Sequence, residues 1–457
     1  MKIYLRNLWE AVQTSFWFVP AVMLALAVGL ASGALAVDET LDVEYVQGFY
    51  WVYDSKPEGA RQLLSTVAGS MIAVAGVVFS ITIVTLTLAS TQFGPRLLRN
   101  FMRDPGNKVV LGTFTSTFLY CLLVLRRIHG GEDAAFVPHL AVALGVLLAV
   151  VSIAVLIYYI HHVASSIQAE NVISAVSADL HAVIDRLFPD PLEAEAATDD
   201  AAPLRAAPAD FLARAAAVAV SASGYIQAID QERLVRIARR HDLVVYLHCR
   251  PGRYLVAGAP LAQVWPASHV NPPLAKAIND AFILGVQPTP EQDVEFAIRQ
   301  LVEVAVRALS PGVNDPFTAI TCIDNLARGL GLLFGRACPS PLHRDADGQL
   351  RLITQPVTVA DIVDAAFNQI RQYGSASVGV CIRLLESIAM LGPLARRAAD
   401  RRALARHAVM IAEECRRQTR QPRDREDLME RRRAALQALG LADAEDFAEV
   451  ADDARLG

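Results

Sequence analysis

The sequence predicts a membrane α-helical fold of four transmembrane helices, followed by a cytoplasmic α+β domain with a small β-rich module and a helical module. Two observations support this prediction. The chain of 457 residues is 53% hydrophobic with a mean hydropathy of +0.33, which is too apolar for an ordinary soluble protein. Its long apolar runs lie in the first third, and later segments alternate between short β-rich runs and amphipathic helical patterns.

Four apolar runs account for the predicted membrane helices. Each is long enough to cross about 30 Å of hydrocarbon at about 1.5 Å per residue, although the third is near the lower limit. The first run also resembles a signal peptide, with Lys2 and Arg6 ahead of it, but it is too long for an ordinary signal core, so we expect it to be retained. The runs are Phe16 to Val37, Leu63 to Thr91, Val109 to Leu125 and Pro138 to Val163.

Basic residues near the ends of these runs predict the orientation. The loop 38–61 contains six acidic and two basic residues, whereas the loop 94–108 contains four basic residues and one acidic residue. Short cytoplasmic loops are enriched in Lys and Arg, so the second loop is predicted to be cytoplasmic and the first external. With four crossings, the N-terminus and the long C-terminal part then both lie in the cytoplasm.

Small and hydroxylated residues form a stripe along the second run. They recur at intervals of three and four residues, so they share one helix face. Two interpretations remain open. The hydroxyls bond carbonyls of their own helix, which packs in the ordinary way, or they line a pore around the axis of a homo-oligomer. The pore-lining candidates are Thr66, Ser70, Ser80, Thr87 and Thr91.

A basic segment follows this stripe. Arg96, Arg99 and Arg103 share one face of a helix that could begin after Pro95. They are interpreted either as a cytoplasmic mouth that concentrates inorganic anions or as anchors that contact lipid headgroups of the bilayer. No acidic or basic residue lies in the middle of an apolar run. This pattern argues against a proton-coupled transporter, which would usually keep an ionisable relay there.

The remaining chain divides by composition. An amphipathic helix is expected to continue the fourth run and to end before Pro189, where an acidic stretch rich in Ala and Pro begins. Short β-rich runs follow, and the turn Pro251-Gly252 predicts a hairpin between LVVYLHCR and RYLVAGAPLAQVWP. The predicted parts are a transmembrane domain 1–164, a helical connector 165–188, a linker 189–210, a β-rich module 211–270 and a helical module 271–457.

A break, ALSPGVNDPFTAI at 308–320, interrupts the helical module. Gly312 is expected to take the positive φ that ends the first helix, while Asp315 and Pro316 suit the N-cap and first position of the next. An ordinary helix corner explains most of these residues. The alternative is that free N–H groups of Phe317 and Thr318 bind an anion or a partner's carboxylate. The helix-corner candidates are Asn314, Asp315 and Thr318.

Other chemistry finds little support in the sequence. The six cysteines form no CxxC pair and lie at no zinc-ligand spacing, so neither a metal nor a cofactor is expected. Segments 343–345, 345–348 and 374–379 resemble fragments of kinase, calcium-loop and hydrolase motifs, but each lacks the other positions that its motif requires. The net charge of −5 and the absence of a basic stripe with aromatic residues argue against nucleic acid. No catalytic residues are predicted.

Three stretches carry a family resemblance: GVVFSITIVTLTLASTQFGPRLLRNF, GTFTSTFLYCLLVLRRI and DVEFAIRQLVEVAVRALSPGVNDPFTAITCIDNL. They resemble the bacterial predicted membrane proteins grouped as domain of unknown function 2254, and the resemblance extends from about Arg6 to about Arg420. It implies a location in the bacterial inner membrane and this architecture. It brings no catalytic residues.

Two functional hypotheses from different classes follow. The leading one is an oligomeric channel whose axis is lined by the second apolar run and whose soluble part gates it. The alternative is a membrane-anchored sensor or scaffold, in which the membrane helices only pack and the cytoplasmic domain binds a ligand or a protein.

Overall fold

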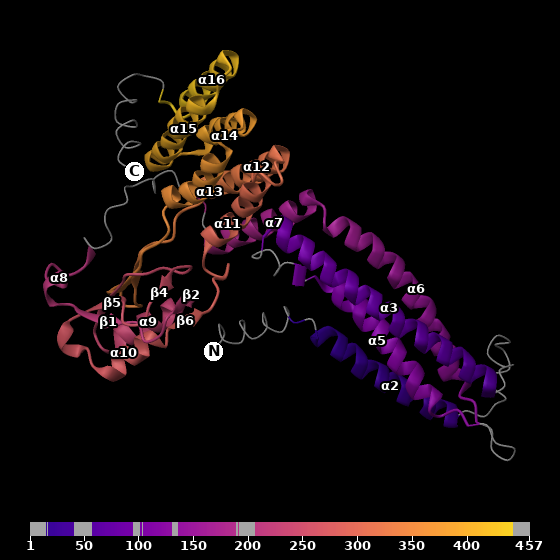
Figure 1. Ribbon diagram of the computed structural model, residues 1–457. Coiled ribbons are helices and arrows are strands. Elements are labelled where there is room, and N and C mark those ends of the chain that lie inside the picture. The colour runs from indigo at the N-terminus through magenta and orange to yellow at the C-terminus, as the bar shows by residue number, and fades with distance from the viewer. Residues whose placement is uncertain are drawn as a thin grey trace. The chain divides into compact units, whose positions relative to one another are not determined.

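The computed structural model describes residues 17–40, 57–94, 104–129, 136–188 and 206–441, together with Ser15, 101–102 and Pro191. It divides into two compact units, 1–171 and 172–457, which are described separately (Figure 1).

The described residues of the first unit form a bundle of four long helices: α2 (Phe18–Thr40), α3 (Pro57–Gln92), α5 (Pro105–Leu125) and α6 (His139–Ser166). Helix α5 packs against each of the other three. Half of the residues in its most apolar stretch are buried, whereas 22% to 28% are buried in the corresponding stretches of its neighbours. Small side chains allow this close packing, as at Ala31 of α2 and Ala68 of α3, both buried. Large apolar side chains on the outer surface are exposed, as expected for lipid contact.

Among the described residues, five helices, not four, are long and apolar enough to cross a membrane. The fifth, α12 (Pro316–Phe334), belongs to the second unit and packs against α11 (Val294–Ala308) and α14 (Val378–Leu391). The expectation of four missed it because its apolar stretch is shorter than the others and contains Asp324. It is the least apolar of the five.

Two further expectations about the first unit need correction. Helix α3 runs beyond the predicted Leu63 to Thr91, and its 36 residues give a length of about 54 Å. The fourth helix does not continue into the connector, because α6 ends at Ser166 and a separate helix, α7 (Ala169–Leu187), begins after Ile167 and Gln168. Helix α7 is amphipathic and buries one face.

The second unit contains two β-sheets and a helical bundle. One sheet has the strand order β1-β5-β3-β8-β7 and the other the order β4-β2-β6. Only the β3–β8 pair is parallel among the described strands. Beyond α7, α11, α12 and α14, the elements are α8 (Phe211–Arg214), β1 (Ala216–Ala219), β2 (Gly224–Ile229), α9 (Gln231–Arg240), β3 (Val244–Leu247), β4 (Tyr254–Leu255), β5 (Pro260–Trp265), η3 (Ala267–His269), α10 (Pro272–Asn279), β6 (Phe282–Gly285), β7 (Leu342–Arg344), β8 (Leu350–Ile353), α13 (Val359–Gly374), η4 (Gly392–Leu394), α15 (Ala398–Gln418) and α16 (Pro422–Ala438).

The two runs on either side of Pro251-Gly252 pair antiparallel as predicted, but the turn does not join the two paired strands directly. That turn follows β3, but β3 pairs with β5, while the short strand β4 between them pairs with β2 in the other sheet. The segment 271–457, predicted to be helical, also supplies β6, β7 and β8. Strand β6 completes the sheet of β2, and β8 joins β3, so both sheets combine strands from distant parts of the chain.

Candidate functional site

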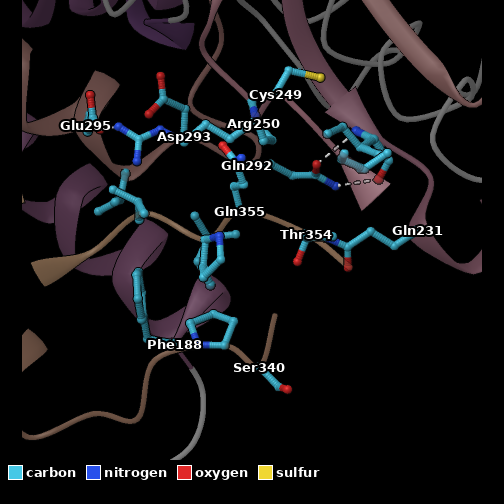
Figure 2. A pocket seen from close by; sticks show the side chains of 18 of the residues that line it. Phe188, Gln231, Cys249, Arg250, Gln292, Asp293, Glu295, Ser340, Thr354 and Gln355 are labelled. Atoms are coloured by element: carbon cyan, nitrogen blue, oxygen red, sulfur yellow. Dashed lines mark hydrogen bonds and ion pairs between the residues drawn. The ribbon is translucent and has the colours of Figure 1, made fainter. Parts of the chain in front are cut away.

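A pocket of about 240 Å³ lies in the second unit. It is formed by the C-terminal end of α7, the ends of β2 and β3, the start of α11, and the loops around Ser340 and Gln355. Figure 2 shows Glu295, Asp293 and Arg250 along one side, with Phe188 and Ser340 at the other. Its wall combines apolar side chains with a few polar groups, as ligand pockets usually do.

Arg250 is the central charged group of this pocket. Its guanidinium donates to Glu295 and, at 2.9 Å, to Asp361, and Glu295 also pairs with Arg299 one helical turn away. The side chains of Arg250 and Glu295 are only 16% and 8% exposed. Because these partners lie on a turn, on α11 and on α13, the ion pairs hold three elements around the pocket.

Asp293 adds a carboxyl group at the N-cap position of α11. It is 8% exposed, and burial together with the neighbouring charge of Glu295 raises its pKa to about 6. The turn at Gly252 packs directly on it: a Cβ added to Gly252, whose φ is +84°, would lie 2.0 Å from Asp293 Oδ2. Glycine is therefore required here both by backbone conformation and by the approach of the carboxylate.

Other polar groups of the wall already have partners within the protein. The amide of Gln292 pairs with the backbone of Ile229, accepting from its N–H at 2.9 Å and donating to its C=O at 3.2 Å. Gln355 Nε2 donates to the hydroxyl of Tyr246 at 2.6 Å. Gln231 also lines the pocket. These contacts keep the wall in place without a ligand.

Two potentially reactive side chains line the pocket, and burial shifts the pKa of both. Burial raises the pKa of the Cys249 thiol to about 12, so it stays protonated at neutral pH. Burial lowers the pKa of His343, whose Nε2 lies 3.2 Å from the hydroxyl oxygen of Thr354. The protonated thiol makes Cys249 a weak nucleophile, whereas the neutral ring of His343 can donate or accept a hydrogen bond.

The end of α7 is fixed firmly at the pocket. Arg186 donates to the carbonyl of Pro290 at 2.8 Å, and Arg336 pairs with Asp185 at 2.6 Å. Leu180 of α7 packs closely against α12, where a Cβ at Gly329 would come within 2.7 Å of it. The position of α7 is thus coupled to the pocket wall and to the helices of the second unit.

The predicted pore-lining hydroxyls face outward from the single bundle. Thr66, Ser70, Ser80, Thr87 and Thr91 are all exposed. Four of them donate to carbonyls of their own helix, Thr66 and Ser70 at 2.8 Å, Thr87 at 2.9 Å and Thr91 at 3.1 Å. Arg96, Arg99 and Arg103, predicted to form a mouth or to contact lipid, lie outside the described residues.

The helix corner forms, with two corrections. Asn314, with a φ of +50°, adopts the left-handed conformation expected for Gly312, because an asparagine side chain tolerates it. The N–H groups of Phe317 and Thr318 are not free: both donate to Asp315 Oδ1 at 3.1 Å, and the Thr318 hydroxyl donates to Oδ2 at 2.6 Å. The corner therefore leaves no open anion site at these amides.

Sequence reasoning missed the pocket. Its residues come from at least six separated segments, and each segment alone shows only ordinary turn or strand chemistry. The one available signal was the turn Arg250-Pro251-Gly252, which combines a charged residue with a glycine at a strand end. It was interpreted only as a hairpin connection.

One family profile and three curated relatives match this chain. The profile of the family described as "Predicted membrane protein (DUF2254)" matches residues 13–390. Uncharacterized proteins of Mycobacterium bovis and of two strains of Mycobacterium tuberculosis are 32% identical over 389 residues, covering 82% of this chain and 71% of theirs. No solved structure matches. The match over most of the chain and the bundle of long apolar helices together show that this protein belongs to the DUF2254 family of predicted membrane proteins.

Proposed function

We propose that this protein is a membrane-anchored sensor whose C-terminal unit binds a small polar molecule in the pocket beside Arg250. The observation that carries the proposal is the course of α7. Its last residues Arg186 and Leu187, with Phe188 directly after them, line the pocket, and its first residue follows α6 after only Ile167 and Gln168. A ligand that favours one position of the end of α7 thereby acts on a helix directly joined to the membrane bundle.

The pocket limits the size and chemistry of the ligand. Its volume of about 240 Å³ is below the roughly 300–1,000 Å³ of sites for drug-sized ligands, which favours a small metabolite. Arg250 is neutralised by Glu295 and Asp361, so the wall does not strongly select anions. Hydrogen bonding to Gln231, Gln355 and the peptide groups of the loops would supply specificity.

Thermal unfolding of the full chain in nanodiscs, with a panel of small polar metabolites, tests the proposal. A bound ligand at a hundred times its Kd stabilises the folded state by about 2.7 kcal/mol. The stabilisation should be lost in Gln231→Leu, which alters the wall without removing an ion pair, and kept in Gln437→Leu, an exposed position on α16. The ligand should also change hydrogen exchange at residues 163–171. Equal stabilisation of both variants, or no change at that junction, would contradict the proposal.

The proposed topology has both chain ends in the cytoplasm of a bacterium, with the helices in the inner membrane. It is supported by the basic loop 94–108 and the acidic loop 38–61. Reporter fusions after Leu441 and within the acidic loop should be active on opposite sides of the membrane. Activity of both on the same side would reject it.

A second candidate function is an oligomeric channel. The observation that favours it is the outward exposure of the hydroxyl stripe on α3, which is available to other copies of the chain rather than to the bundle. Ion flux through liposomes containing the protein should then fall in Ser70→Leu and Thr87→Leu. The matched change Thr115→Leu, on α5, should not affect flux. A monomer in nanodiscs would remove this candidate. Absence of flux through the unaltered protein would also remove it.

A further inference from the structure

The turn that joins α15 to α16 is strongly basic. Its residues 416–425, RRQTRQPRDR, contain five arginines and one aspartate, in a chain whose net charge is −5. All five arginines are exposed. We call this segment the basic turn; Figure 1 shows the two helices that it joins lying side by side.

Most of this charge is not neutralised within the protein. Arg417 approaches Glu413 at 3.7 Å, and Arg425 donates to the backbone carbonyl of Thr419 at 2.6 Å. Within the described part of the chain, Arg416, Arg420 and Arg423 form no ion pair. The positive charge of Arg416 also acts on Arg432 of α16. Burial is the main cause that lowers the pKa of Arg432; Glu413 opposes this lowering, and Arg416 adds to it.

Helix stability does not account for these residues. Arg416 and Arg417 in the last turn of α15 interact favourably with the negative end of its dipole. Arg423 and Arg425 lie in the first turn of α16, where the positive end of the dipole disfavours them and Asp424 between them offsets only part of that effect. An exposed cluster of like charges, part of it at an unfavourable helix end, indicates a partner that supplies negative charge.

The chemistry of the surroundings distinguishes among anionic partners. Neither α15, α16 nor the turn contains Phe, Tyr or Trp, so bases of single-stranded nucleic acid would find no stacking surface. No large apolar side chain is exposed in the turn, so insertion into hydrocarbon is not indicated either. A bilayer, by contrast, is present wherever a chain of a membrane-protein family folds, and its anionic lipids supply phosphate groups.

We propose that the basic turn binds the headgroups of anionic phospholipids at the surface of the membrane in which the protein resides. Arginine guanidinium groups form bidentate hydrogen bonds with phosphate, and an anionic lipid surface attracts clusters of basic residues. The contact is peripheral and electrostatic, and it is independent of the ligand pocket and of any pore.

Hydrogen exchange of the full chain tests this proposal, comparing nanodiscs of phosphatidylcholine alone with nanodiscs of equal parts phosphatidylcholine and phosphatidylglycerol. Peptides covering 416–425 should exchange more slowly in the anionic discs, and the difference should disappear at about 1 M salt, where the screening length falls to about 3 Å. The combined change Arg416→Gln, Arg420→Gln and Arg423→Gln should remove the difference. Each arginine lost should weaken lipid binding about fivefold.

A matched variant controls for loss of charge alone. Arg236→Gln, Arg240→Gln and Arg253→Gln remove the same charge from exposed positions elsewhere in the unit and should leave the lipid effect intact. Equal exchange in the two kinds of disc would overturn the proposal, as would equal loss in both triple variants. Protection by added transfer RNA but not by phosphatidylglycerol would instead assign the turn to a soluble polyanion and reject the lipid. Loss of the lipid effect with folding intact, shown by unchanged exchange in β2 and β3, supports it.

Discussion

The membrane unit and the C-terminal unit satisfy their polar groups by different means. In the bundle, hydroxyls bond carbonyls within one helix or reach a neighbouring helix, as Thr82 bonds both Val78 O at 2.8 Å and Tyr159 Oη at 2.9 Å. In the C-terminal unit, arginines bond carboxylates on other elements, as Arg383 of α14 bonds Asp324 of α12 at 2.5 Å. A hydroxyl can therefore be satisfied locally, whereas an arginine pair depends on how two elements are positioned.

This difference predicts where the protein tolerates change. A serine or threonine exposed on the bundle loses little when its surroundings change, because its own helix supplies an acceptor. A buried arginine or carboxylate in the C-terminal unit loses a charged partner, and an uncompensated charge in low dielectric is costly. Matched substitutions in the two units measure the contrast.

The largest contrast is expected among three glycines. Gly252→Ala places a Cβ in a backbone of positive φ and against the carboxylate of Asp293, which together should cost roughly 3 kcal/mol. Gly258→Ala has the same backbone strain, with a φ of +88°, but its added Cβ would meet no atom within 4 Å, so it should cost about 1 kcal/mol. In the bundle, Gly145→Ala brings its Cβ to 2.8 Å from Cδ2 of the buried Leu64 without any positive φ, and should cost about 1 kcal/mol.

Chemical unfolding of the full chain in detergent, with hydrogen exchange to assign each unit, measures these three costs. An equal cost for Gly252→Ala and Gly258→Ala would mean that the carboxylate moves aside freely and that the pocket wall is not held tightly.

A second difference concerns pH. The folded pKa of Asp293 is about 6, above the unfolded value of about 3.9, so the folded state binds a proton more tightly. Stability from this residue is fully present below about pH 4 and is lost as pH rises through 6, by about 3 kcal/mol in all. Asp293→Asn should remove this dependence, measured as hydrogen exchange of α11 between pH 4 and 7. The exposed change Glu232→Gln should leave it unchanged; the same slope in all three proteins would reject the assignment.

The sequence was sufficient for features that depend on composition and local order. Long apolar runs predicted α2, α3, α5 and α6, because a helix must satisfy its own backbone in lipid. Asp315 followed by Pro316 predicted a helix start correctly, since capping is a local interaction. The prediction that Gly312 adopts the left-handed conformation was wrong, because Asn314 and Gly312 both tolerate it and only packing distinguishes them.

Features that depend on contacts between distant segments were not predictable. Strand β8 has only four residues, which is too short for a recognisable sequence periodicity. Its parallel partner β3 lies more than a hundred positions earlier in the chain. The pocket has the same origin: Arg250 meets Glu295 and Asp361 only after the sheets and the bundle assemble. Charge clusters such as the basic turn are visible in sequence, but their lack of internal partners is not.

A third contrast comes from two helix starts of the same sequence type, one in each unit. Asp104-Pro105 begins α5 and Asp315-Pro316 begins α12, and each aspartate caps its helix, Asp104 by accepting from Gly106 N–H at 2.8 Å. Asp315→Ala should cost about 1 kcal/mol, the usual value for a cap. Asp104→Ala should cost more, because Asp104 also bonds His162 of α6 at 2.5 Å.

Thermal unfolding followed by hydrogen exchange of α5 and α12 measures both variants. The pKa of Asp315 is lowered, chiefly by the hydrogen bond from the Thr318 hydroxyl. Its contribution is therefore present above the unfolded pKa of about 3.9 and is lost as pH falls through the lower folded value. A cost for Asp315→Ala that grows on acidification would contradict its role as an ionised cap.

The smallest contrast concerns one hydroxyl in each unit. Tyr159→Phe removes the contacts of its hydroxyl with Thr82 and with Val78 O on α3, but Thr82 keeps its own bond to Val78 O. Because one hydroxyl proton serves both contacts, the cost should be about 0.6 kcal/mol, the average for such bonds in membrane helices. Tyr246→Phe leaves Gln355 Nε2 without its acceptor beside the pocket and should cost about 1 kcal/mol. The second cost should vanish when Gln355→Met is added, because neither partner then remains unpaired, whereas adding Thr82→Val to Tyr159→Phe should not restore stability. If instead the membrane pair shows the larger coupling in these two double-mutant cycles, local satisfaction by the helix is not what makes the bundle tolerant.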